Sequence, residues 1–362
     1  MTKSLRVGII GVSADSGWAR ESHVPAVQKL AGMELVAVAS KGQAKSDAAA
    51  EAFGVKAAYG DAADLIRDPN IDLVAVCVKG PDHRALVLGA LAAGKHVYCE
   101  WPLGRNTAEA EEMATAVDVA GVHAAVGLQT RMNPAVRRAR ELVEAGAIGR
   151  LLSSHIYSST VGFGPIVPTT YLYLEDPENG VNLVTIQGAH TIDLAIAVLG
   201  GLLDVAALTT AQYPEIEIGE DARRQARSTF DHVLVQARLA AGGALSVEVA
   251  GGRPPETPFR MEVVGEKGAL TLDGGAARGF QSGRLRLALK GESQPVDEGE
   301  CALMPDAAAN VSGVYIALRN DIHQATSTAP DFHHAVRLSR LVDDLLSSST
   351  TGVRKSAMDW PV

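Results

Sequence analysis

A glycine-rich turn near the start of the chain carries the first pattern that predicts chemistry. The apolar run Leu5–Ile10 leads into Gly11, and a further glycine, Gly17, stands directly before Trp18. Between a strand and a helix, such a turn lets backbone N–H groups approach a pyrophosphate. The match to Gly-x-Gly-x-x-Gly is incomplete, because Ser13 holds the second glycine position and Gly17 comes one residue late. The turn predicts dinucleotide binding, with an ordinary strand-to-helix turn as the alternative.

The residues after the second apolar run bear on which dinucleotide would bind. This run, Glu34–Ala39, is followed by Ser40 and Lys41. An acidic side chain at this point would bind the hydroxyls of the adenosine ribose and repel a 2′-phosphate. A hydroxyl and a cation instead attract the phosphate. The pair favours NADP over NAD, unless Lys41 is simply a solvated loop residue.

The elements that must position these residues alternate between short apolar runs and helical patterns. The runs lack polar alternation, which is typical of parallel strands covered on both faces. Residues 1–126 are therefore predicted to form a doubly wound α/β domain that binds the dinucleotide. We expect strands at Leu5–Ile10, Glu34–Ala39, Ile71–Val78 and His96–Cys99, and helices at Val24–Ala31, Lys45–Phe53, Ala62–Arg67, Arg84–Ala93 and Thr107–Ala120.

From residue 127 onward the patterns change to those of an α+β domain. Several runs alternate apolar and polar residues, which suits an antiparallel sheet with one wetter face. Glycines at 242–243 and at 265 and 268 predict hairpins. Residues 127–362 are therefore predicted to form a substrate-binding and oligomerisation domain. We expect strands at Leu151–Thr160, Val205–Tyr213, Phe230–Leu239, Ala244–Ala250, Met261–Val264 and Ala269–Leu272, and helices at Pro134–Ala145, Ala189–Leu199, Val314–Ala325 and His333–Ser347.

Composition narrows the functional classes. The chain has 362 residues, of which 47% are apolar and 21% charged, as in globular proteins. Its 33 basic and 42 acidic side chains give a formal charge of −9, so broad nucleic-acid binding is not expected. The three cysteines have neither disulfide nor zinc spacing. No run suggests a membrane span or a signal peptide. We expect a cytoplasmic protein without metal, membrane or nucleic-acid partners.

Further motifs resemble those of one family, the Gfo/Idh/MocA oxidoreductases, which are relatives of glucose–fructose oxidoreductase and inositol dehydrogenase. The resemblance covers essentially the whole chain. It implies a Rossmann domain, a second domain with a largely antiparallel, open-faced sheet, a substrate between them, and assembly into dimers or tetramers. The matching segments are Pro81–His83, Ala92–Val97, Glu100–Pro102, Arg131 after a strand at Ala124–Leu128, Gly188–Asp193, Glu266–Leu270 and Pro330–His333.

A second set of segments resembles one branch of that family. This branch contains the fungal galactose-pathway repressor, which is known as a dinucleotide-binding regulator of transcription rather than as an enzyme. The segments are Gly17–Ala19, His23–Pro25, Glu100–Trp101 and Asn179–Thr185. The resemblance therefore leaves open whether the chain catalyses a reaction.

The family chemistry implied by the resemblance passes a hydride from a sugar or polyol carbon to the nicotinamide. A base must then take the hydroxyl proton. The family's usual groups are the lysine of Glu-Lys-Pro and an Asp-x-x-x-His pair, and their positions hold Trp101, Ile186 and His190 here. His190 is the expected general base, and Asp193, on the same helix face at i+3, is expected to orient it. The alternative makes both inherited packing or capping residues.

Other side chains are candidates for the missing groups. Lys79 ends the third strand on the cofactor side, where it is either catalytic or solvated. Tyr171 and Tyr173 precede the histidine segment and offer phenols. Trp101 offers a flat apolar surface, or only fills the space of the lysine. From the pattern and the resemblance, the expected cofactor contacts are Gly11, Ser13, Gly17, Trp18, Ser40, Lys41, Lys79, His83, Glu100, Trp101 and Pro102, and the expected substrate contacts are Trp101, Arg131, Tyr171, Tyr173 and His190.

Three functional classes are compatible with this pattern. The first is an NAD(P)-dependent dehydrogenase of a sugar or polyol, whose choice of sugar would lie in loops such as Val161–Asp176. The second is an NADP-binding regulator that acts through a protein partner, because no basic recognition helix is present. The third uses bound cofactor for a transient oxidation. The basic residues Arg223, Arg224 and Arg227 are expected on a solvated face, and the pair His333–His334 on the surface.

Overall fold

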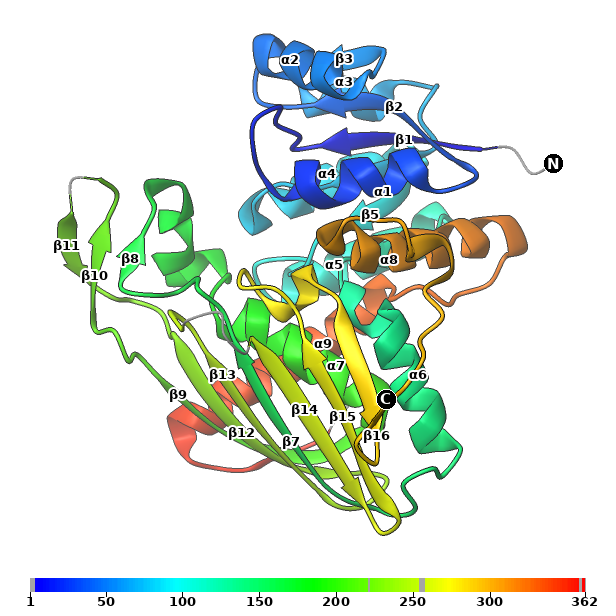
Figure 1. Cartoon of the computed structure of the whole chain (residues 1–362). Helices are drawn as coiled ribbons and strands as arrows, with labels where there is room; N and C mark the ends of the chain where they lie inside the picture. The colour runs from blue at the N-terminus through cyan, green and yellow to red at the C-terminus, as the bar shows by residue number, and fades with distance from the viewer. Residues whose placement is uncertain (1–3, 221, 254–257, 358–359, 362) are drawn as a thin grey trace. The chain divides into compact units, whose positions relative to one another are not determined.

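The computed structural model describes residues 4–220, 222–253, 258–357 and 360–361 (Figure 1). The chain divides into two compact units, Met1–Gln129 with Gly299–Val336, and Thr130–Glu298 with Arg337–Val362. We call them the first and the second unit and describe each by itself. The sequence suggests a single division between residues 126 and 127. The units instead divide after Gln129, and Gly299–Val336 belongs to the first unit.

The described part of the first unit contains a six-stranded parallel sheet in the order β3-β2-β1-β4-β5-β6. The strand order reverses between β1 and β4, which confirms the predicted doubly wound sheet. Strand β3 was not predicted, because three half-buried residues leave no apolar run. The strands are β1 (Leu5–Ile10), β2 (Met33–Ala39), β3 (Ala57–Tyr59), β4 (Leu73–Val76), β5 (His96–Cys99) and β6 (Ala124–Val126).

The helices of this sheet begin and end at recognisable caps. Asn106 accepts a hydrogen bond from the Glu109 N–H at the start of α5, and Gly121 ends that helix with a left-handed conformation. The helices are the π-helix η1 (Ala19–His23), α1 (Val24–Lys29), α2 (Gln43–Phe53), α3 (Ala62–Arg67), the 3₁₀ turn η2 (Gly80–Asp82), α4 (His83–Ala92) and α5 (Thr107–Ala120). The bounds of α1 to α5 lie within two residues of the predicted ones, whereas η1 and η2 were not predicted.

Helix α8 (Asp306–Gln324) returns to the first unit and packs beside α1. Arg319 of this helix donates to the carbonyl of Ala31 at 2.6 Å and to Glu300 at 2.8 Å. The backbone N–H of Val126 donates to the carbonyl of Pro330 at 2.8 Å, so the segment after α8 borders β6. The sequence predicted a shorter helix, Val314–Ala325, within the second domain. Only these long-range contacts reveal where the helix belongs.

The second unit is built on a nine-stranded sheet in the order β17-β16-β15-β14-β7-β13-β12-β9-β18. Neighbouring strands are antiparallel except β7 and β13, which confirms the predicted, largely antiparallel sheet. The glycine turns form the expected hairpins β12–β13 and β14–β15. The strands are β7 (Leu151–Ser159), β9 (Leu202–Thr210), β12 (His232–Leu239), β13 (Ala244–Ala250), β14 (Phe259–Gly265), β15 (Gly268–Gly274), β16 (Leu285–Leu289), β17 (Glu292–Ser293) and β18 (Lys355–Ser356).

Helices cover one face of this sheet. In β12, Val233 and Val235 are buried while Leu234 and Gln236 are exposed, as an amphipathic strand requires. Figure 1 shows α7 and α9 behind the strands, and Thr209 of β9 hydrogen-bonds α9. The helices are α6 (Pro134–Glu144), α7 (Ala189–Leu199) and α9 (Phe332–Thr351), of which α9 begins in the first unit.

A small three-stranded sheet, in the order β11-β10-β8, was not foreseen. Its strands are β8 (Ile166–Val167), β10 (Glu215–Ile218) and β11 (Arg223–Ala226). The expectation of a solvated basic face is wrong for Arg227, which is buried, although Arg223 and Arg224 are exposed. The expectation that the pair His333–His334 lies on the surface is wrong for His334, which is buried at the start of α9.

The stretch Pro177–Leu199 in the described part of the chain is long and apolar enough to cross a membrane by length and composition alone. Every residue of α7, which forms its second half, is buried inside the second unit. Core helices pass the same test, so the packing of the unit accounts for this apolar stretch.

Candidate functional site

The glycine-rich turn lies at the carboxyl end of β1, where doubly wound sheets bind dinucleotides. Gly11 has φ +97° and its N–H donates to the carbonyl of Ala39 at 2.8 Å. A side chain on Gly11 would collide with the carbonyl oxygen of Cys77. Gly17 has φ +114° and open space where a side chain would stand. The turn therefore leaves exposed backbone of the kind a pyrophosphate needs, and the Ser13 hydroxyl accepts from the Asp15 N–H within it.

Ser40 and Lys41 stand directly after β2. The Ser40 hydroxyl donates to the carbonyl of Val12, and its N–H donates to Ser46 at 2.9 Å, so Ser40 fixes the turn. The Lys41 ammonium is 91% exposed and lies 3.4 Å from the Asp82 carboxylate. Lys41 can therefore reach a phosphate, but a neighbouring acid weakens its attraction.

The carboxyl end of β5 carries a hydrogen-bonded chain of side chains. Trp18 Nε1 donates to one oxygen of Glu100 at 2.9 Å, and His23 Nε2 lies 2.9 Å from the other. His23 Nδ1 lies 2.8 Å from the hydroxyl of Tyr315 in α8. Two predicted cofactor residues, Trp18 and Glu100, are thus brought together. His23, which the sequence analysis placed only in a segment of the resemblance, and Tyr315 were not predicted beside them.

The predicted contact His83 is 1% exposed and holds the backbone around it. Its Nδ1 lies 2.8 Å from the carbonyl of Pro102, and its Nε2 lies 3.0 Å from that of Val78. Burial lowers the pKa of His83. His83 therefore positions the turn of Trp101 and Pro102, whose peptide bond is cis. Trp101 is 7% exposed.

The second unit holds the other predicted catalytic residues on α7. A π-helix, η6 (Val184–Gly188), leads directly into α7, and such segments occur often at functional sites. His190 and Asp193 are both buried. Arg131, which is 16% exposed, donates to Asp193 at 2.8 Å. Asp193 therefore orients Arg131. The sequence analysis expected Asp193 to orient His190 and did not predict this contact with Arg131.

Two carboxamides near His190 were missed by the sequence analysis. Gln187, one turn before His190, donates to the Ser158 hydroxyl at 3.2 Å and is 1% exposed. A side chain on Gly279 would come within 2.7 Å of the carboxamides of both Gln187 and Gln281. The carboxamides of Gln187 and Gln281 therefore both lie next to Gly279. Gln187 and Gln281 are 94 positions apart in the sequence, so no sequence motif could have shown that they are close.

The two predicted tyrosines lie on a 3₁₀ helix, η4 (Thr169–Glu175). Burial, together with the nearby Tyr171, raises the pKa of Tyr173 to about 12. A phenol with this pKa stays protonated at neutral pH, so Tyr173 can donate a hydrogen bond but cannot serve as a base. Arg278 lies 3.4 Å from the Tyr171 hydroxyl.

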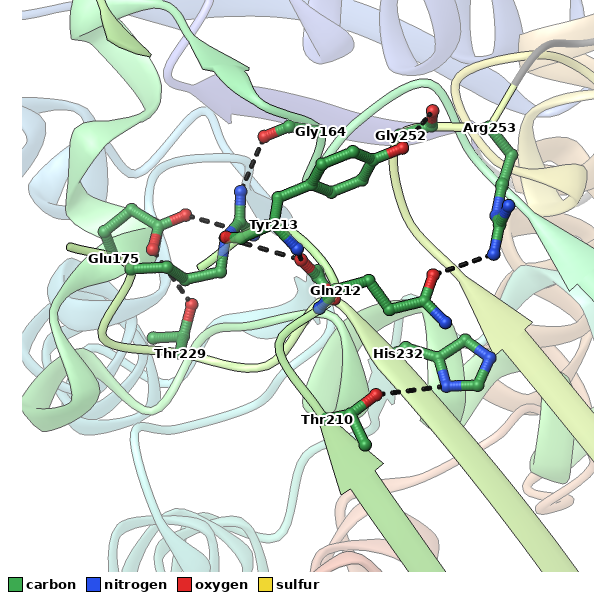
Figure 2. A network of polar contacts seen from close by, with 11 residues as sticks. Gly164, Glu175, Thr210, Gln212, Tyr213, Thr229, His232, Gly252 and Arg253 are labelled. Carbon is green, nitrogen blue, oxygen red and sulfur yellow. Dashed lines mark hydrogen bonds and ion pairs between the residues drawn. The ribbon is translucent and has the colours of Figure 1, made fainter. Parts of the chain in front are cut away.

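Arg227 joins this helix to the rest of the second unit. Figure 2 shows its partners Glu175, Gly164 and Tyr213 within one network of polar contacts. Its guanidinium donates to the carbonyls of Tyr213 at 3.1 Å and Gly164 at 2.5 Å. It also lies 3.5 Å from the carboxylates of Glu175 and Asp231, and all three side chains are almost fully buried. Arg227 therefore ties η4, through Glu175, to Gly164, to Tyr213 and to Asp231, the residue directly before β12.

Lys79, the remaining predicted catalytic residue, precedes η2 and is exposed in the first unit. Among the described residues, no group of three or more His, Cys, Asp or Glu side chains could hold a metal ion.

Comparison with known families defines the class of the protein. Residues 5–128 match a model described as an oxidoreductase family with an NAD-binding Rossmann fold. Residues 134–274 match a model of the Gal80p C-terminal domain. The chain belongs to the Gfo/Idh/MocA oxidoreductase family.

Particular relatives include both dehydrogenases and a regulator. Dehydrogenase aclE of Aspergillus oryzae is 31% identical over 289 residues, covering 76% of this chain and 78% of the relative. The galactose/lactose metabolism regulatory protein GAL80 of Saccharomyces cerevisiae is 27% identical, covering 91% and 82%. Levoglucosan dehydrogenase of Pseudarthrobacter phenanthrenivorans is 28% identical, covering 88% of each. A crystal structure of a Saccharomyces cerevisiae Gal80p super-repressor mutant superposes with a TM-score of 0.85 at 26% identity, covering 98% of both chains.

Proposed function

We propose that the protein is a cytoplasmic, NAD(P)-dependent oxidoreductase that oxidises a sugar, a polyol or a related carbohydrate by hydride transfer. The observation that carries the proposal is the retention of His190 on α7, beside an Asp193 that holds Arg131. A buried imidazole and a guanidinium oriented by the same helix provide a proton acceptor and a hydrogen-bond donor for a substrate hydroxyl. The dehydrogenases among its relatives support the same class.

In the proposed reaction, separate residues bind the dinucleotide, accept the proton and orient the substrate. The dinucleotide, when bound, supplies the acceptor for the hydride, and the exposed backbone of the Gly11–Gly17 turn holds its pyrophosphate. His190 takes the proton that leaves the substrate hydroxyl. Arg131, fixed by Asp193, donates hydrogen bonds that orient the substrate oxygens, and Tyr173 offers a protonated phenol as a further donor.

The choice between NADP and NAD rests on Lys41 and its neighbour Asp82. Lys41→Ala is expected to weaken NADP binding about 2- to 5-fold while NAD binding changes little, because an exposed charge pair contributes up to about 1 kcal/mol. Asp82→Asn is expected to strengthen NADP binding by a similar factor, since it releases the lysine. Calorimetric titration of both variants with both dinucleotides measures this. Equal changes for NADP and NAD would contradict the assignment.

We also propose that the protein forms homo-oligomers through the uncovered face of the large sheet. Leu208 and Leu234 are cross-strand neighbours and are 52% and 40% exposed. Exposed apolar sheet faces usually find a partner. Leu234→Asp is expected to shift the protein to monomers at micromolar concentration in light scattering. The control Leu303→Asp changes a leucine that is 88% exposed in the first unit, and should leave the assembly unchanged. A monomeric parent protein would refute the proposal.

A second function is favoured by one observation, the indole of Trp101 at the position of the family's lysine. In this alternative the chain binds the dinucleotide without turning over and regulates carbohydrate metabolism through a protein partner. The match of residues 134–274 to the Gal80p C-terminal domain supports it.

One screen separates the two functions. The protein is incubated with sugars, polyols and lactones together with NADP or NAD, and the absorbance band of the reduced nicotinamide is followed. Reduction with any of these compounds supports the oxidoreductase. Tight dinucleotide binding with no reduction across the panel supports the regulator.

A further inference from the structure

Glu100 places a carboxylate at the carboxyl end of β5 in the first unit. In doubly wound sheets the strands β4 to β6 form the half that binds the second nucleotide, which in these cofactors carries the nicotinamide. The Glu100 side chain is 15% exposed, so it borders the surface where a dinucleotide would lie.

The hydrogen bonds around Glu100 determine its charge. Burial raises the pKa of Tyr315 well above its ordinary value, so its phenol keeps its proton. His23 Nδ1, at 2.8 Å, is the hydrogen-bond partner of that hydroxyl within the described residues, so the phenol donates to Nδ1. Nε2 must then carry the proton of a neutral imidazole and donate to Glu100 at 2.9 Å.

The other oxygen of Glu100 also accepts a hydrogen bond. Trp18 Nε1 has no lone pair to offer and can only donate, at 2.9 Å. Both carboxylate oxygens therefore face N–H donors. With Glu100 ionised and His23 neutral, each N–H and O–H of Trp18, His23 and Tyr315 in this chain has an acceptor.

No cation neutralises this carboxylate within the described part of the chain. Its recorded ion-pair partner is His23, which is neutral in this arrangement. The residue that follows, Trp101, is uncharged. The Glu100 carboxylate is therefore partly shielded from solvent and has no cationic side chain in ion-pair contact among the described residues.

We propose that Glu100 makes the protein select the oxidised form of its nicotinamide dinucleotide. The oxidised ring carries one positive charge and the reduced ring carries none, so a nearby carboxylate stabilises only the oxidised form. This inference rests on the proposed dinucleotide binding and deepens it. The substrate is then an alcohol carbon that gives up a hydride, or, for a regulator, the signal is the oxidised dinucleotide itself.

Glu100→Gln tests the inference without requiring turnover. The dissociation constants of the oxidised and the reduced dinucleotide are measured by calorimetry for the parent and the variant. The ratio of the two constants is expected to shift about tenfold toward the reduced form. Coulomb's law gives that factor for unit charges about 12 Å apart at an effective dielectric constant of about 20.

Two further variants serve as a charge-matched control and as an independent test of the same prediction. Asp82→Asn also removes a negative charge from the first unit, but one beside Lys41, and should leave the oxidised-to-reduced ratio unchanged. Trp101→Lys adds a cation next to Glu100 and should shift the ratio as Glu100→Gln does, even if the glutamine variant fails to fold.

The outcomes separate this inference from the function on which it rests. Folded Glu100→Gln or Trp101→Lys protein whose ratio stays within twofold of the parent would overturn the inference and leave the oxidoreductase proposal standing. A parent protein that binds neither form at millimolar concentration would contradict the dinucleotide proposal, and the selection by Glu100 with it.

Discussion

Replacing His190 by alanine is expected to lower kcat about 10²- to 10⁴-fold, the usual contribution of a general acid–base group. Dinucleotide affinity should change no more than a few-fold, because His190 belongs to the second unit and the glycine-rich turn to the first. The limb of the pH–rate profile that reports this imidazole should disappear in the variant. Steady-state kinetics across pH, with a binding titration beside it, measures all three effects.

The matched control for this variant is His155→Ala. His155 is an exposed histidine on β7 of the same unit, bonded to Ser246, and its removal should leave kcat unchanged. A His190→Ala protein that keeps more than half of the parent kcat would move the proton transfer to another group. Lys79 would then be the next candidate, since Tyr173 stays protonated at neutral pH.

Replacing Arg227 by methionine is expected to destabilise the second unit by about 3–5 kcal/mol, the cost of breaking a buried ion pair from one side. Glu175 and Asp231 would remain as buried carboxylates without their cation. The helix η4 would lose its anchor, so a rise in KM should accompany the loss of stability. Urea unfolding gives the free energy, and hydrogen exchange over residues 166–176 gives the local effect.

Arg224→Met supplies the comparison on the adjacent strand. The Arg224 side chain is 70% exposed and pairs with Glu217, so its loss should change stability little. Equal unfolding curves for the Arg227 variant and the parent protein would show that the buried cluster contributes no stability, and the assignment of Arg227 as the anchor of η4 would be wrong.

The sequence predicted the elements whose signal is local. Strands β1 and β5 and helices α3 and α5 match their expected bounds. Apolar runs, capping residues and terminal glycines involve only residues that are close together in the sequence, so they can be recognised without knowledge of the fold. Strand β3 and the small sheet of β8, β10 and β11 were missed, since strands of two to four residues are too short for an apolar run or an alternation to stand out, although Ile216 and Ile218 of β10 are buried.

Features that depend on distant parts of the chain could not be predicted. Trp18 and Glu100 are 82 positions apart, and the hydroxyl that completes their chain comes from α8. Arg227 lies in a run of basic residues that looks solvated, yet its partners Glu175 and Asp231 bury it. Side-chain identity along one segment does not reveal such partners. The contacts of the candidate residues, and neighbours such as His23 and Tyr315, could be found only from the structure.

The transfer of hydride from a carbohydrate carbon to the nicotinamide is the central claim, and isotope transfer tests it most directly. The protein is incubated with oxidised dinucleotide and a panel of sugars and polyols that carry deuterium on their carbinol carbons, and the recovered cofactor is analysed by mass spectrometry. We predict that at least one compound yields reduced cofactor bearing one deuterium. Cofactor that stays oxidised with every compound, or is reduced without gaining deuterium, would contradict the claim.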